Sequence, residues 1–441
     1  MNRKHAITTV ALAASFSVAT FASAQQPQQA EPTREQLQQQ LADLQARIAK
    51  LESSDAQKAA AAQTKAEVLS DAERRSTLGP VAPLTAGYDK GFFIRSEDGN
   101  FLFKPALQTQ FRYVANSGED ADGDDEFESG FELRRTRFRF DGNAFSPDFT
   151  YSFVFDTNRS GGNVSLLEAW GAYKFADHWS VKLGQFKESA FHEKDVPFTN
   201  QLAVEKSLVN AILGGDQVDR VQGVALLYGG GKEDDVRAEF ALHDGANSKN
   251  TNFQDTDTGD WGVGARGEYK LGGDWANYRD FTAKGTKEQL FVVGAGADFT
   301  QAGDVDILRA TADAQWESAD GLGIYGAFHG NQTDAGDAGD GFDWGALAQV
   351  GYLINKKTEL FARYDLVALD DVAPGDEDTF NEFTIGANYY LGPDGAYLHR
   401  AKFTLDVVYL PDGAPSSQSG LGILGSDEDQ FVLRGQFQLQ I

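Results

Sequence analysis

The feature that most constrains this chain is a two-residue alternation of apolar and polar side chains, which begins near Phe101 and recurs to the last residue. A period of two places successive side chains on opposite faces of a β-strand. Sixteen segments show the pattern, and the predicted strands are 101–114, 130–141, 148–158, 165–175, 179–187, 218–229, 235–244, 260–271, 289–300, 305–317, 321–331, 342–354, 358–370, 381–391, 399–410 and 428–441. Alternation alone does not separate a membrane barrel from a water-soluble sandwich, because both alternate.

The lengths of the connections favour the barrel. Long connections such as 188–217 and 411–427 tend to alternate with short ones such as 355–357, with exceptions at 272–288 and 301–304. An even number of strands, with short turns at one rim and long loops at the other, is typical of outer-membrane barrels. The predicted fold class is therefore all-β, a 16-stranded antiparallel transmembrane β-barrel over 101–441 that follows an N-terminal helical coiled-coil segment.

Residues 1–24 have the features of a secretory signal peptide. Arg3 and Lys4 precede an apolar run, and the run closes on Ala22-Ser23-Ala24, a small-residue cleavage signature. Export with cleavage after Ala24 is the expectation. Export by itself leaves two outcomes for the mature chain, a soluble exported protein and an outer-membrane barrel, and the strand count and connection lengths favour the barrel.

Residues 31–78 have helical composition and an apolar seam. Leu37, Leu41, Leu44, Ile48 and Leu51 are spaced alternately by four and three residues, which is the pattern of a coiled coil. We predict a periplasmic, self-associating coiled coil, with an amphipathic helix packed on the rest of the protein as the alternative. Gly79 and Pro80 end the helix, and 79–100 is the expected linker.

Composition removes several classes of function. The chain has no cysteine, and its six histidines lack metal-ligand spacing, so we expect no metal site and no cofactor. The net charge of −27 disfavours a nucleic-acid partner. Residues 262–267 match G-x-G-x-x-G but lie within a predicted strand, so we expect no enzyme. Acidic residues crowd the long connections, which leaves open a calcium site or a solvated acidic rim.

Sixteen strands enclose more space than side chains can fill, which implies a water-filled channel. The face opposite the aromatic stripe should line this channel, and Lys104 and Arg112 lie on it. In the second strand, Arg135, Arg137 and Arg139 share the inward face and form a ladder with steps of about 7 Å. Such a ladder would pass an anion from one site to the next. The alternative is that these arginines pair with acids of the lumen and only stabilise the wall.

Several motifs resemble one family of channels. They begin the second strand at 131–137, precede the long connection at 183–187, lie within it at 202–209, and follow it at 219–224. In these motifs and across most of the mature chain, the sequence resembles the phosphate-selective porin O/P family of Gram-negative outer membranes. The resemblance adds Lys187, Lys206 and Arg220 to the expected anion-binding residues. It implies a trimer of barrels, a periplasmic amino-terminal segment, and a long loop folded into the lumen against an arginine-rich wall.

Two residues depart from the family pattern. Lys206 stands where the family usually has arginine, and the chain ends in Ile441 where the last strand usually ends in an aromatic residue.

The predicted function is an outer-membrane porin for passive diffusion of small hydrophilic solutes, preferring anions such as phosphate. Its expected partners are membrane lipid, small anions and two further copies of the chain. The alternative is a structural anchor whose coiled coil tethers the cell envelope.

Overall fold

The computed structural model describes residues 34, 38–39, 41–46, 83–89, 91–119, 125–254, 259–336, 339–370, 377–426 and 428–441. The chain divides into two units, Met1–Val81 and Ala82–Ile441. In the first unit the described residues are helical. The expected signal peptide and the rest of the expected helix over 31–78 lie outside the described residues, and the coiled coil stays a prediction. No helix within the described ranges is both long and apolar enough to cross a membrane.

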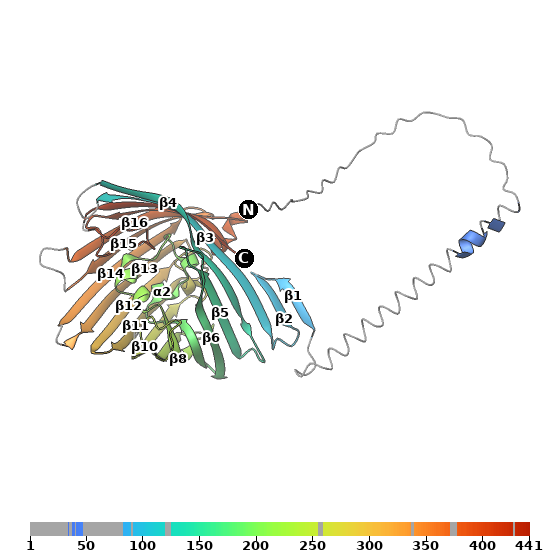
Figure 1. The fold of residues 1–441 in the computed structure, drawn as a ribbon, viewed down its shortest axis with the longest axis horizontal. Helices are drawn as coiled ribbons and strands as arrows, with labels where there is room; N and C mark the ends of the chain where they lie inside the picture. The colour runs from blue at the N-terminus through green and yellow to red at the C-terminus, as the bar shows by residue number, and fades with distance from the viewer. Residues whose placement is uncertain are drawn as a thin grey trace, which may run out of the picture. The chain divides into compact units, whose positions relative to one another are not determined.

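The second unit is a closed barrel of sixteen antiparallel strands (Figure 1). Each strand pairs with the next along the chain, and the last pairs with the first from Gln430 opposite Gly118 to Gln440 opposite Gln108. The strands are β3 (Leu102–Glu119), β4 (Asp125–Asn143), β5 (Phe149–Thr157), β6 (Val164–Ala176), β7 (Trp179–Lys187), β8 (Arg220–Gly229), β9 (Val236–His243), β10 (Trp261–Gly272), β11 (Leu290–Ala302), β12 (Val305–Glu317), β13 (Leu322–Asp334), β14 (Asp340–Leu353), β15 (Thr358–Ala368), β16 (Thr379–Tyr390), β17 (Ala401–Leu410) and β18 (Gln430–Gln440). The barrel confirms the predicted strand number and chain order.

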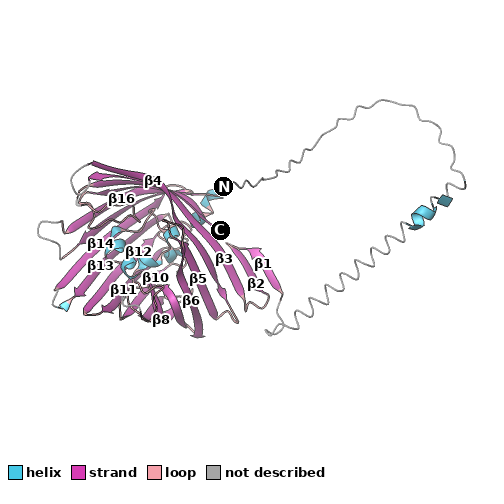
Figure 2. Ribbon diagram, viewed as in Figure 1, coloured by secondary structure: helices cyan, strands magenta, loops and turns pink. Residues whose placement is uncertain are grey.

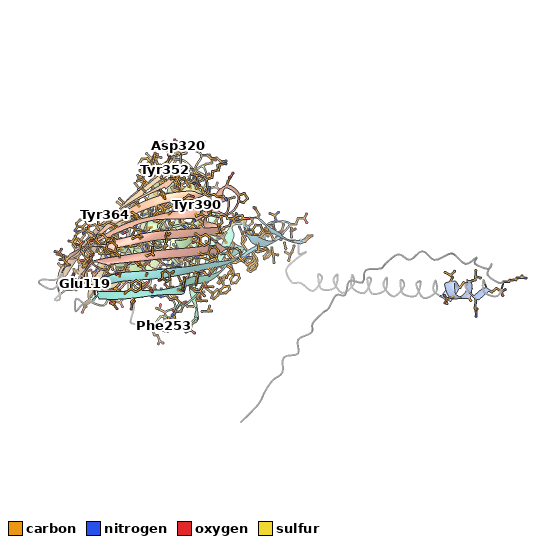
Figure 3. All side chains as sticks on the ribbon, turned by 90° about the horizontal axis from the view of Figure 1, so that it is seen from above. Glu119, Phe253, Asp320, Tyr352, Tyr364 and Tyr390 are labelled. Carbon is orange, nitrogen blue, oxygen red and sulfur yellow. The ribbon has the colours of Figure 1, made fainter. Side chains whose placement is uncertain are left out.

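A hairpin that the sequence did not predict lies within the expected linker. Strands β1 (Leu84–Tyr88) and β2 (Phe92–Ser96) pair with each other, and β2 continues onto the start of β3 through Ile94 and Arg95. This end of the barrel, where β3 begins and β18 ends, is called here the chain-end rim. Glu119, at the far end of β3, marks the opposite loop rim (Figure 3).

The two faces of the wall differ as the alternation predicts. Apolar side chains cover the outside, where Tyr352 and Tyr364 are 50% and 38% exposed (Figure 3). Polar side chains face inward and are buried, as with Arg434 and Gln436 of β18. An apolar outer band and a polar interior are the arrangement of a barrel whose solvent outside is lipid.

The connection over 188–219, called here the inserted loop, lies inside the ring of strands. It contains the short helices α2 (His192–Asp195), η1 (Phe198–Asn200), α3 (Leu208–Ile212) and α4 (Gly215–Val218), drawn in cyan within the barrel in Figure 2. Wall residues bond to its backbone: Lys402 donates to the Gln201 carbonyl at 2.6 Å, and Asn388 to the Leu202 carbonyl at 3.0 Å. The folded-in loop that the family resemblance implied is therefore present.

The inserted loop carries an apolar core into the lumen. Leu208 and Val209 of α3 are fully buried against inward-facing apolar residues of the wall, and the connection 411–429 packs on the same core. The wall contributes Leu347, Phe361, Val367, Phe380, Val408, Leu410 and Val432. Apolar packing thus closes the lumen beside β14–β18.

The long turn 273–289 also folds inward, from the chain-end rim. It contains η2 (Asn277–Arg279), and its Tyr278 and Phe281 are buried. Tyr278 stacks on His192 of the inserted loop with ring centroids 3.9 Å apart. The turn is one of the two exceptions to the predicted alternation of connection lengths, and its extra length fills lumen space.

Candidate functional site

A cavity of about 270 Å³ lies between the inserted loop and the wall strands β4–β8, and it is called here the constriction cavity. Cationic side chains dominate its lining: eight are Lys or Arg, and three are Asp. The cationic residues are Arg134, Arg135, Arg137, Lys187, Lys194, Lys206, Arg220 and Lys249, and the acidic ones are Asp156, Asp216 and Asp219. This excess of positive charge lies inside a molecule whose net charge is −27.

Two β-bulges shape the wall at this cavity. In β4, Gln110 faces Arg135 while Phe111 faces Leu133, so Arg134 is an extra residue. In β6, Leu167 is extra in the same way. A bulge reverses the in-and-out order of the side chains beyond it. Arg134 and Arg135 therefore both point inward, and both bulged residues, Arg134 and Leu167, line the constriction cavity.

Every arginine of the constriction cavity has a carboxylate partner. Arg134 and Arg135 bind Glu205 of the inserted loop at 2.8 and 2.6 Å. Arg137 lies 3.0 Å from Asp156, and Arg220 lies 2.6 Å from Asp219. Burial would raise the pKa of Glu205, but the charges of Arg134, Arg135 and Arg112 outweigh burial and hold that pKa well below its usual range. Glu205 is thus a buried anion.

Two lysines of the cavity differ from these arginines. Nζ of Lys187 and Nζ of Lys206 both donate to the carbonyl oxygen of Lys194, at 3.0 and 2.9 Å. Among the described residues, neither ammonium lies within 4.0 Å of a carboxylate oxygen. Burial lowers the pKa of Lys206 to about 8. Within the part of the chain that the structure describes, these two ammonium groups are thus cations of the cavity without a carboxylate at ion-pair distance.

The ring of Phe198 organises the cations around it. The guanidinium carbon of Arg135 lies 3.5 Å from the ring centroid, and that of Arg137 lies 5.5 Å away. Nζ of Lys206 lies 4.4 Å from the same centroid. An aromatic face attracts cations, and the attraction strengthens where water is displaced. Phe198 thus gathers like charges that would otherwise repel each other.

A larger cavity of about 800 Å³, called here the rim chamber, opens at the chain-end rim. Lys104, Arg139 and Arg237 line it, and Lys187 lines both cavities. Asp280 of the turn 273–289 also lines the rim chamber, 3.1 Å from Nε2 of His399. Burial raises the pKa of Asp280 to about 8.

The structure divides the eight sequence-predicted residues into three groups. Arg135, Arg137, Lys187, Lys206 and Arg220 meet at the constriction cavity. Lys104 and Arg139 lie in the rim chamber, where Arg139 is 2.6 Å from Asp141. Arg112 lines neither of these cavities; its side chain is fully buried and binds Glu132 and Glu205.

The predicted site residues did not include Arg134, Lys194 and Phe198, which line the cavity, or Glu205, which binds Arg134 and Arg135 without lining it. One signal for Arg134 is in the sequence, because the outward apolar positions change from odd at Phe131 and Leu133 to even at Phe138, and this change requires an extra residue between them. The other three lie on the inserted loop, whose path no local pattern specifies. Within the described residues, no group of three or more His, Asp or Glu is arranged to hold a metal ion.

The fold and the basic constriction define a transmembrane β-barrel channel, a porin. The family model of the phosphate-selective porins O and P matches residues 106–315, which run from β3 to β12 and include the inserted loop. Over these residues the chain is similar to the phosphate-selective porin O/P family, and it forms a channel in a Gram-negative outer membrane.

Solved structures share the fold at low sequence identity. An anion-selective porin from Comamonas acidovorans has a TM-score of 0.54 at 12% identity, covering 77% of this chain and 100% of its own. Pseudomonas putida OprB has a TM-score of 0.52 at 10% identity, and the match covers 77% of this chain and 94% of OprB. The trimer form of Vibrio cholerae OmpT has a TM-score of 0.51 at 10% identity, and the match covers 76% of this chain and 99% of OmpT. No curated protein sequence matches the chain.

Proposed function

We propose that this porin conducts small hydrophilic anions, inorganic phosphate among them, by passive diffusion through the constriction cavity. The observation that carries the proposal is the pair of ammonium groups, Lys187 and Lys206, whose hydrogen bonds go to a carbonyl and leave their charge available. The anion-selective porin of similar fold supports the same preference. The fold and the family point to a channel and away from an enzyme.

The assembly and orientation complete the proposal. The family resemblance and the trimer form of OmpT support a homotrimer in membrane lipid. The chain-end rim would face the periplasm, because short turns lie on that side in outer-membrane barrels. The helical segment over 31–78 would then be periplasmic. A trimer predicts that one insertion event in a planar bilayer gives three equal, independently blockable conductance levels.

Reversal potentials in a potassium chloride gradient test the anion preference. We expect the wild-type channel to prefer chloride over potassium, and Lys187→Gln with Lys206→Gln to lower the chloride-to-potassium permeability ratio by about tenfold, since each lost charge acts on the ion at about 1 kcal/mol or more. Lys356→Gln is the matched control, because this lysine is 74% exposed at a turn. A cation-selective wild-type channel rejects the proposal, and the absence of conductance favours the anchor.

A further inference from the structure

Glu205 is the most heavily bonded anion at the constriction. Its Oε1 accepts hydrogen bonds from Arg112 at 2.8 Å and Arg134 at 2.8 Å, and Arg135 donates to both carboxylate oxygens at 3.0 and 2.6 Å. Only 1% of the Glu205 side chain is exposed. Arg363 also donates to the Glu205 backbone carbonyl at 3.0 Å, which fixes the inserted loop at this residue.

Three guanidinium groups that converge on one pair of oxygens form an oxyanion site. Guanidinium binds carboxylate and phosphate oxygens with the same planar, two-pronged geometry. The three groups come from two adjacent wall strands, β3 and β4, and β4 supplies two in succession because of its bulge. Arg134 and Arg135 also line the constriction cavity, so the site adjoins the path of the solute.

We propose that Glu205 is a built-in competitor of the permeating anion. Its carboxylate fills the three-arginine site, and anions in transit are left with the ammonium groups of Lys187 and Lys206. The inference rests on the proposed anion preference and adds the residue that sets its strength. A channel must bind its solute weakly enough to release it, and three unoccupied arginines would hold a phosphate too tightly for rapid passage.

Neutralising the carboxylate tests this role. The full chain with Glu205→Gln is reconstituted in planar bilayers of diphytanoylphosphatidylcholine, and inorganic phosphate is titrated against the chloride current. We expect the half-blocking phosphate concentration to fall by about tenfold, because hydrogen bonds to charged groups are each worth about 1.5–3 kcal/mol. The single-channel chloride conductance should not rise. In Glu205→Gln with Arg112→Gln, the half-blocking concentration should return toward the wild-type value.

The control is Asp298→Asn. Asp298 is also buried and lies 3.9 Å from an arginine, Arg309, but it lines neither the constriction cavity nor the rim chamber. Its phosphate block should match the wild type. An unchanged block in Glu205→Gln overturns the inference, and so does a weaker block with a larger conductance, which would mean that Glu205 only holds the loop. A wild-type channel without anion preference rejects the proposed function instead, and the reversal potential shows this separately.

Discussion

Arginine and lysine have different surroundings at the constriction. The arginines of the cavity are held by carboxylates, whereas Lys187 and Lys206 are held by a neutral carbonyl. A guanidinium keeps its charge at any ordinary pH, while a buried ammonium can lose its proton. In the proposed function, the charge offered to the solute therefore belongs to lysine ammonium groups, which a rise in pH can neutralise.

Anion preference should decline as the pH rises from 7 to 9. Lys206, with a pKa of about 8, is charged below that pH and neutral above it. Asp280, also with a pKa of about 8, is neutral below that pH and negative above it. Both changes remove positive charge from the path as the pH rises, so they act in the same direction. Reversal potentials measured at constant salt from pH 6.5 to 9.5 would show the decline.

Two substitutions separate these contributions. Lys206→Arg keeps a charge at high pH and should remove part of the decline, and adding Asp280→Asn should remove most of the remainder. A full pH dependence in the double variant would assign the effect to other groups.

Phe198 should affect solute binding without carrying charge. Phe198→Leu removes the ring that attracts Arg135 and Lys206 but keeps an apolar side chain. We expect the half-blocking phosphate concentration to rise by about threefold, since one such contact is worth about 0.5–1 kcal/mol. Phe253→Leu, at a loop position that is 95% exposed, is the control and should not change the block.

Among the elements, β4 shows most clearly how sequence and structure relate. Its alternation predicted that Arg135, Arg137 and Arg139 face inward, but Arg134 was assigned no inward role. A strict period of two does not allow two adjacent inward residues, and only the bulge does. The outward apolar residues have odd numbers up to Leu133 and even numbers from Phe138. This change indicates the bulge, because each outward apolar residue must face lipid.

Changing the length of β4 tests this assignment. Deleting Arg134 restores strict alternation with Phe131 and Leu133 still outward, so we expect a folded barrel that lacks one of the three arginines at Glu205. Heat-modifiable mobility in SDS gels measures the folding of this variant, and loss of the folded form would contradict the assigned register.

Other elements could not be predicted from the sequence, and the reasons are physical. All sixteen wall strands were predicted because each repeats a local period, but β1 and β2 span only five residues each, too few for a period to stand out. The connection lengths predicted a long loop over 188–217, but its folding into the lumen was implied by the family resemblance alone. Its position depends on contacts such as Val204 with Asp406, 202 positions apart, which no local pattern encodes.

At the scale of the whole molecule, the lumen is filled by apolar packing on one side and contains polar cavities on the other. The core around Leu208 closes the side beside β14–β18, and the cations line the side of β4–β8. Burying a charge in that core costs several kcal/mol. Leu208→Asp should therefore expel the inserted loop while the wall persists.

The expected readout of Leu208→Asp is a larger single-channel conductance with weaker anion preference, in a barrel that keeps its heat-modifiable mobility. Phe253→Asp at the exposed loop position should change neither property. An unaltered conductance in Leu208→Asp would show that the apolar core does not determine the width of the path.

The apolar core packed inside the lumen also affects which solutes can cross the channel. A porin narrowed by a flexible segment can yield to a bulky molecule, but this filter is a folded body with its own interior, and widening it means unfolding that body. A solute too bulky for the path beside this body would have to disrupt the apolar core to pass, so packing as well as charge would restrict what the channel admits.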